Sequence, residues 1–112
     1  MFGFLRKKKA SATSGGDALL TKIDGKELAY VTERVPDDSG TVIECVLGKV
    51  GRINAHDGLI IIVCNGSPVF SCNSDQAEYG ELRSLAGVII KGIDRDSGKF
   101  RTVVAYYQYY RT

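Results

Sequence analysis

The sequence predicts an all-β protein, folded as a small antiparallel barrel or roll with one short helical turn before the last hairpin. The dipeptides Asp57-Gly58 and Asn65-Gly66 carry this prediction, because their residues reach positive φ at low cost, as two-residue hairpin turns require. They enclose the run 59–64, LIIIVC, which has the length of a strand and is apolar at every position. We expect this strand to be buried on both faces and to form the core.

The length and composition are those of one globular domain. The chain has 112 residues, of which 44% are hydrophobic and 25% charged, so it can bury its own core without disulfides or metals. The net charge of +2 arises at the N-terminus, because residues 6–9 hold four of the fifteen Lys and Arg, which leaves eleven against thirteen acidic residues over 10–112. Nucleic acid is therefore not the expected partner of this mildly acidic body.

Residues 1–16 are predicted to be a disordered apolar and basic leader with a flexible linker, followed by a single β-rich domain over residues 17–112. Three apolar side chains precede four cations, and these residues form a candidate membrane-surface segment: Phe2, Phe4, Leu5, Arg6, Lys7, Lys8 and Lys9. Each cation is worth about 1 kcal/mol near an anionic leaflet, and the apolar tip adds partial insertion. We expect a cytoplasmic protein held weakly at the inner face of the membrane. A solvated leader without function is the alternative.

The segment from residue 18 to 35 allows two interpretations. Asp24 can cap a helix that runs to Arg34, or Asp24-Gly25 can turn a hairpin between residues 19–23 and 28–32. The β-prone residues 30–32 favour a strand in the second half. A loop over 36–40 follows.

Further strands are predicted on both sides of the central hairpins. Residues 41–54 form a long strand in which Gly48 and Gly51 mark a bulge or a bend. A turn over 73–75 leads to one turn of α- or 3₁₀-helix over 79–85. A strand over 88–93, a loop over 94–98 and a last strand over 99–110 complete the series.

Three cysteines, Cys45, Cys64 and Cys72, are predicted to be buried free thiols in a reducing compartment. If Asn65-Gly66 forms the expected turn, Cys64 lies opposite Ser67 and Cys72 lies opposite Leu59, so these two thiols do not face each other.

No active site, metal site or cofactor site is predicted. The single His56 cannot complete a zinc site with the cysteines, whose spacing is not that of zinc ligands. His56 lies beside Asp57 at the mouth of a turn, and Glu78 and Glu81 fit a solvated face. We therefore expect that the protein is not an enzyme.

The last strand has the most unusual composition, with four tyrosines: Tyr106, Tyr107, Tyr109 and Tyr110. Alternation places Val103, Ala105, Tyr107 and Tyr109 on one face and Val104, Tyr106, Gln108 and Tyr110 on the other. Because so small a body cannot easily bury all four phenols, one pair is expected to be exposed as anchors for a protein partner or as stacking platforms for bases. Alternatively, the rings only cover the barrel, with their hydroxyls in water.

Residues 46–53, VLGKVGRI, resemble the Gly-x-x-Gly loop of KH domains, which clamps a nucleic-acid backbone. The turn dipeptide Asp57-Gly58 follows within six residues, where a KH domain has a helix, so we expect a bent strand with Lys49 and Arg52 as solvated charges. If the protein is instead a nucleic-acid-binding barrel, its expected contacts are the leader, Lys49, Arg52 and the tyrosines.

In outline, residues 41–110 are similar to the SH3-like and Sm-like small barrels, with a PH-like roll as the alternative. The Sm pattern Asp-x-x-x-Asn is missing from the strand after Asp57-Gly58, so RNA binding is not implied. The function that we predict is a non-enzymatic adaptor or binding domain for an unidentified protein partner, and a nucleic-acid-binding barrel is the alternative. A homodimer is a further expectation, since a long last strand at a sheet edge can pair with a second copy.

Overall fold

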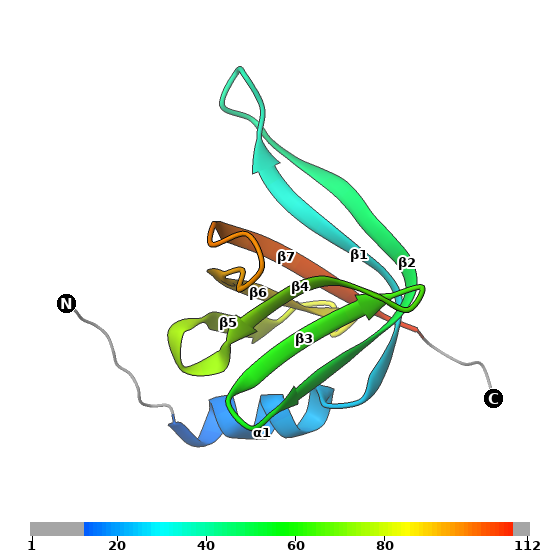
Figure 1. Ribbon diagram of the computed structural model, residues 1–112, viewed down its shortest axis with the longest axis vertical. Coiled ribbons are helices and arrows are strands. Elements are labelled where there is room, and N and C mark those ends of the chain that lie inside the picture. Colours follow the sequence, from blue (N-terminus) through cyan, green and yellow to red (C-terminus); the bar gives the residue numbers. More distant parts are fainter. Residues whose placement is uncertain (1–12, 109–112) are drawn as a thin grey trace.

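A seven-stranded antiparallel sheet, curled into a half-barrel, dominates the computed structural model, which describes residues 13–108 (Figure 1). The elements are, in chain order, α1 (Thr13–Ile23), β1 (Lys26–Pro36), β2 (Val42–His56), β3 (Leu59–Cys64), β4 (Ser67–Asn73), the 3₁₀ turn η1 (Ser74–Gln76), β5 (Glu78–Glu81), β6 (Gly87–Ile93) and β7 (Phe100–Tyr107). The predicted all-β class is confirmed.

The two predicted hairpin turns are also confirmed. Asp57 and Gly58 have φ values of 56° and 77°, and Asn65 and Gly66 have 53° and 79°, as expected for two-residue turns of the primed type. They connect β2 to β3 and β3 to β4. Across the second turn Cys64 lies opposite Ser67, as predicted, but a β-bulge at Ile62/Val63 moves Cys72 opposite Ile60 instead of Leu59.

The strand order is β4-β3-β2-β1-β7-β6-β5. The central strand is therefore β1, and β3 lies next to the edge strand β4. Ile60, Ile62 and Cys64 of β3 are buried, whereas the alternate residues are half-buried, so the prediction that this strand is buried on both faces was wrong. The last strand β7 lies between β1 and β6, which removes the edge on which the predicted self-pairing of that strand depended.

The helix α1 lies against β2 and β5, below the curled sheet in the view of Figure 1. Its last residue, Ile23, is fully buried in the core. The turn Asp24-Gly25 then joins this helix to β1, so the second half of residues 18–35 is a strand, as favoured, and the first half is helical. The helix begins at Thr13, four residues before the predicted start of the domain.

Two further segments differ from expectation. The helical turn predicted over 79–85 was wrong, because η1 occupies Ser74–Gln76 and residues 78–81 form β5. The Gly-x-x-Gly segment lies within the continuous strand β2. The prediction of a bent strand at this segment is therefore confirmed, and the segment is not a KH-like loop. Within residues 13–108, no helix is long and apolar enough to span a membrane.

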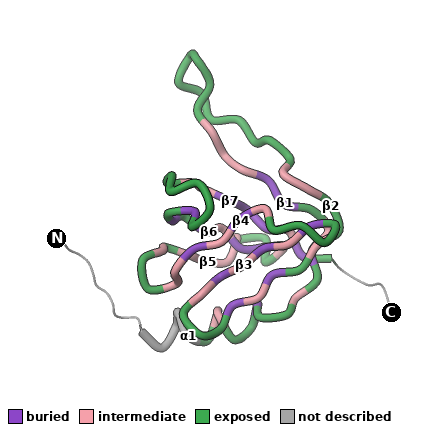
Figure 2. Tube along the Cα trace, in the orientation of Figure 1, coloured by how far each residue is buried: buried purple, intermediate pink, exposed green. Residues whose placement is uncertain are grey.

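The hairpin of β1 and β2 extends beyond the rest of the sheet (Figure 1). Both strands pair with each other along their length, but β2 pairs with β3 only from Gly51 to His56. Figure 2 shows buried positions on the strands of the body, whereas the far end of this hairpin is exposed. This extension gives the molecule a surface that does not contribute to the core.

Candidate functional site

The outer face of the sheet, opposite the core, carries rows of aligned side chains across β2, β1, β7 and β6. The register places Lys49, Tyr30, Tyr106 and Gly87 in one row, Val46, Thr32, Val104 and Ile89 in the next, and Glu44, Arg34, Thr102 and Lys91 in a third. Neighbouring side chains on one face of a sheet lie close enough to interact. An aromatic row and a charged row therefore enclose a mostly apolar one, and we call this region the tyrosine surface.

Two stacked tyrosines mark the centre of the tyrosine surface. The rings of Tyr30 and Tyr106 lie with their centroids 4.5 Å apart and their planes at 22°. Tyr30 is 39% exposed, and Tyr106 is half-buried. Burial and the nearby Glu44 carboxylate raise the pKa of Tyr106 above its ordinary value, so its hydroxyl stays protonated and donates a hydrogen bond.

Glu44 holds this arrangement together. Its carboxylate accepts hydrogen bonds from the Tyr106 hydroxyl at 3.1 Å, from Thr32 Oγ1 at 3.0 Å and from Arg34 Nε at 3.1 Å. Partial burial raises the pKa of Glu44, but the bonds from these three groups outweigh it, so the pKa lies below its usual value. Thr32 and Val104 are buried within this network although they belong to the outer face.

The alternation predicted for the last strand holds as far as the structure describes it, but the tyrosines separate. Tyr106 contributes to the tyrosine surface. Tyr107 belongs to the buried core, where its hydroxyl donates to Glu81 and the Lys26 ammonium lies 5.2 Å from its ring centroid. This burial removes Tyr107 from the candidate surface. Tyr109 and Tyr110 lie outside the described residues, as do the leader residues 2–9.

The two basic candidates lie in different places. Lys49 is exposed and pairs in register with Tyr30, next to the stacked rings. Arg52 instead approaches Glu27, with 3.5 Å between Nη2 and the carboxylate. Arg52 also lines a separate shallow hollow of about 420 Å³ beside the Asn65-Gly66 turn. The structure thus brings Lys49, but not Arg52, to the tyrosine surface.

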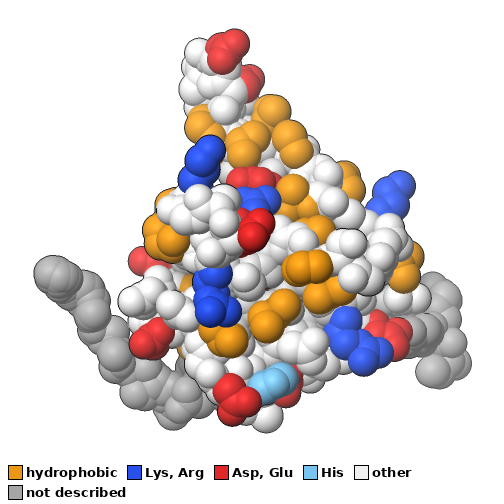
Figure 3. All heavy atoms as spheres, in the orientation of Figure 1, with side chains coloured by type: hydrophobic (Ala, Val, Ile, Leu, Met, Phe, Trp, Pro, Cys, Tyr) orange, Lys and Arg blue, Asp and Glu red, His pale blue; other side chains and the backbone are white. Residues whose placement is uncertain are grey.

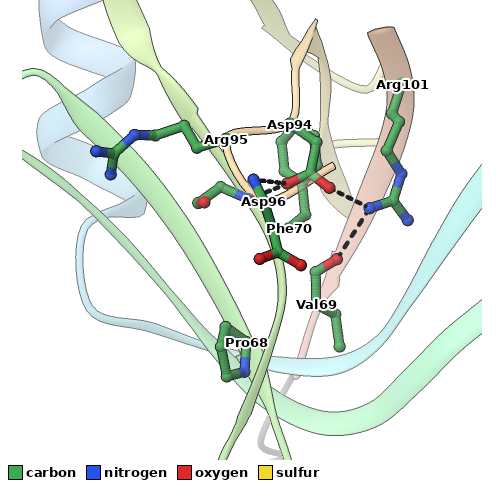
Figure 4. A pocket seen from close by; sticks show the side chains of 8 residues that line it. Pro68, Val69, Phe70, Asp94, Arg95, Asp96 and Arg101 are labelled. Atoms are coloured by element: carbon green, nitrogen blue, oxygen red, sulfur yellow. Dashed lines mark hydrogen bonds and ion pairs between the residues drawn. The ribbon is translucent and has the colours of Figure 1, made fainter. Parts of the chain in front are cut away.

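A second hollow, of about 420 Å³, lies between the start of β4 and the loop from β6 to β7 (Figure 4). Inside it, Arg101 donates to Asp94 at 2.9 Å and to the Val69 carbonyl at 3.2 Å, and it holds Glu33 through two bonds of 2.8 and 3.1 Å. Such a forked guanidinium ties β1, β4 and β7 together.

Asp94, which is 3% exposed, is held from several sides in this hollow. It accepts hydrogen bonds from Ser97 Oγ at 3.0 Å and from the backbone N–H of Ser71 at 3.3 Å. Burial raises the pKa of Asp94, but the bonds from Ser97 and Arg101 outweigh it and the pKa lies below the ordinary value. These contacts connect the loop from β6 to β7 with β1, β4 and β7. Sequence reasoning placed Asp94 in a loop and did not single out Arg101, since nothing local signals their pairing.

The single histidine and the three cysteines line neither of the two hollows. His56 Nδ1 lies 3.0 Å from Asp24, and both side chains are exposed. Among the side chains that the structure describes, residues 18–108, no three His, Cys, Asp or Glu come together to hold a metal ion. Cys64 and Cys72 are buried, as predicted, but Cys45 is exposed on the projecting hairpin, so the prediction was wrong for that residue.

Comparison with known proteins adds no assignment. No protein-family model matches the chain, and neither the curated proteins nor the solved structures include a significant match.

Proposed function

We propose that the chain is a non-enzymatic binding module whose tyrosine surface binds a segment of a partner protein. The observation that carries this proposal is the stacked pair of Tyr30 and Tyr106, held in place by Glu44 and partly exposed. Tyrosine anchors give large contact area for little loss of side-chain entropy, and a ring that is already fixed loses less still. The half-buried Ile89 beside the rings offers an apolar contact to the same segment.

The charges favour a polypeptide over a nucleic acid. The Glu44 carboxylate lies beside the Tyr106 ring, where a base stacked on the rings would bring its phosphate near a negative charge. The charged row contains both signs, with Glu44 and Glu78 at its ends and the cations Arg34 and Lys91 between them. An extended segment with apolar side chains fits a surface of this kind, whereas a polyanion does not.

The proposal also includes a segment that binds the membrane weakly. Residues 2–9 would hold the module at an anionic, cytoplasmic membrane surface through their four cations and apolar tip. The helix α1 begins at Thr13, so a deletion of residues 2–9 removes none of the described helices and strands. Such a leader would make binding reversible and sensitive to salt.

Binding at the tyrosine surface is tested by comparing the partners captured by the full chain and by two variants. Tyr30→Ser removes the exposed ring, and Leu85→Ser removes an exposed apolar side chain outside the tyrosine surface. The proposal predicts that a captured protein is lost with Tyr30→Ser and kept with Leu85→Ser, and that the purified partner binds with the same ranking. Equal binding to all three chains would contradict it. Single-stranded RNA is the parallel ligand, and tyrosine-dependent RNA binding with a steep salt dependence would favour the nucleic-acid alternative.

Membrane binding by this segment is tested by co-sedimentation with anionic and neutral vesicles. We expect the full chain to sediment with anionic vesicles only, and the chain lacking residues 2–9 to stay in solution. If both forms sediment equally, the leader is not the segment that binds the membrane. Circular dichroism of the shortened chain confirms that its fold is retained.

A further inference from the structure

One side of β2 is a free strand edge. Residues 42–49 pair with β1, but pairing with β3 starts only at Gly51. At the boundary, the Val50 carbonyl accepts a hydrogen bond from the Asn65 N–H at 3.2 Å. Before that point, alternate backbone groups of β2 face away from β1 and have no strand beside them among the described residues.

The two outer strands of the sheet are protected, in contrast to β2. In β4, the Ser71 carbonyl accepts the Arg95 N–H at 2.8 Å and the Ser71 N–H donates to Asp94. The same strand carries Pro68, which blocks pairing. The other outer strand, β5, has four residues. Short strands, prolines and lysines are the usual protection of sheet edges. Residues 42–49 contain no proline, and their one lysine, Lys49, lies at the end of the stretch where pairing with β3 begins.

The free edge is also apolar. Val42, Ile43 and Val46 are 61%, 43% and 58% exposed. Figure 3 shows hydrophobic side chains gathered on the projecting hairpin, below its acidic tip. Glu44, the acidic residue within this stretch, is already bonded to Arg34 and Thr32. The edge therefore offers backbone hydrogen bonds and apolar side chains together, which is the combination that strand addition uses.

We propose that two copies of the chain pair through residues 42–49 of β2, in antiparallel orientation, to form one continuous sheet across a two-fold axis. An antiparallel strand edge is complementary to itself, and a two-fold interface closes without further growth. An axis at Cys45 places Glu44 opposite the partner subunit's Val46, and an axis at Val46 places it opposite the partner subunit's Gly48. In neither register does Glu44 lie opposite the partner subunit's Glu44, so no like charges meet at the centre of the interface.

The occupant is a second copy because an antiparallel edge can pair with its own copy without bringing like charges together, and because this edge belongs to the hairpin that projects from the body (Figure 1). Pairing covers Val42, Ile43 and Val46 of both copies at once. It leaves Tyr30 and Tyr106 on the outer face of the joined sheet, so the dimer does not depend on the proposed function.

The mass of the full chain in solution tests this proposal. Sedimentation equilibrium is expected to give twice the chain mass of 12.2 kDa. Val46→Lys places a cation on the edge, as natural edge strands do, and is expected to give the monomer mass. Leu85→Lys, at an exposed site elsewhere, is the matched control and stays dimeric. A monomeric parent chain, or a dimer unchanged by Val46→Lys, would overturn the proposal.

Cross-linking through Cys45 is a second test, and the parent chain can be used for it without a substitution in the free edge. Cys45 is exposed, whereas Cys64 and Cys72 are buried and burial raises the pKa of Cys72 to about 11. In either register the two Cys45 Cα atoms lie within about 10 Å of each other, given the spacing of paired strands. A short bis-maleimide should therefore link the parent chain into a covalent dimer, and Cys45→Ser should abolish the link. A dimer that does not cross-link through Cys45 pairs elsewhere, which would refute the proposed edge even if Val46→Lys failed to fold.

Discussion

The hydroxyl of Tyr106 on β7 donates a hydrogen bond of 3.1 Å to the carboxylate of Glu44 on β2. Because β1 lies between these strands, the Tyr106 side chain has to cross it to reach its acceptor. One carboxylate thereby connects three strands on the outer face, and it fixes the ring against which Tyr30 stacks. These contacts hold the side chains of the tyrosine surface in place within the fold.

Tyr106→Phe removes this hydroxyl and keeps the ring. A half-buried hydrogen bond to a carboxylate contributes about 1 kcal/mol, so we expect the free energy of unfolding to fall by that amount in urea titration. Tyr30→Phe is the control, because the Tyr30 hydroxyl makes no hydrogen bond to the described part of the chain. Equal losses in both variants would argue against a role for the Glu44 bond.

Arg101→Ala should be the more damaging change. It leaves the buried Asp94 and the half-buried Glu33 without their shared cation, and removing one partner of a buried ion pair costs about 3 kcal/mol. Arg101→Lys restores the charge but not the forked geometry, so it should recover only part of the loss. Denaturant titration of the parent chain, Arg101→Ala and Arg101→Lys measures their free energies of unfolding. Full recovery of stability by Arg101→Lys would show that the positive charge alone is enough, without the forked geometry.

His56 should titrate above its ordinary pKa of 6.5, because its ring is hydrogen-bonded to Asp24 and lies near that negative charge. The folded-state pKa is raised, so the contribution of charged His56 to stability is fully present below pH 6.5 and is lost as the pH rises through the folded-state pKa. NMR titration of this single histidine measures the midpoint. Asp24→Asn should bring the midpoint back toward 6.5, and an unchanged midpoint would exclude Asp24 as the cause.

Gly51→Ala should destabilise the junction of β2 and β3. An added Cβ would lie 2.3 Å from the Val63 carbonyl oxygen and 2.8 Å from Cys64 Sγ, so one strand has to move. We expect a loss of about 1–3 kcal/mol, as for overpacked cores. Gly80→Ala is the matched control, since nothing lies within 4 Å of the added atom, and thermal unfolding of both proteins makes the comparison.

Several elements could be predicted from the sequence because they depend on residues that are close to one another in the chain. The conformations of Asp57-Gly58 and Asn65-Gly66 depend on two residues each, so the hairpins of β2, β3 and β4 followed from the sequence. The alternation in β7 likewise separated Tyr106 from Tyr107 onto opposite faces, although it did not show which face was the core. Residues 79–85 were misassigned because the pairing of β5 with β6 outweighed a weak local preference for helix.

The sequence by itself determined the all-β class and the tight turns between β2, β3 and β4, because strand periodicity and turn conformation are set by residues within a few positions of one another. The tertiary structure decided that β7 lies inside the sheet, that Arg101 joins Glu33 and Asp94, and that half of β2 has a free edge. These features depend on pairings between residues far apart in the chain, such as the 68 positions that separate Glu33 from Arg101. Such pairings depend on how all seven strands assemble into one sheet. They therefore leave no local pattern in the sequence.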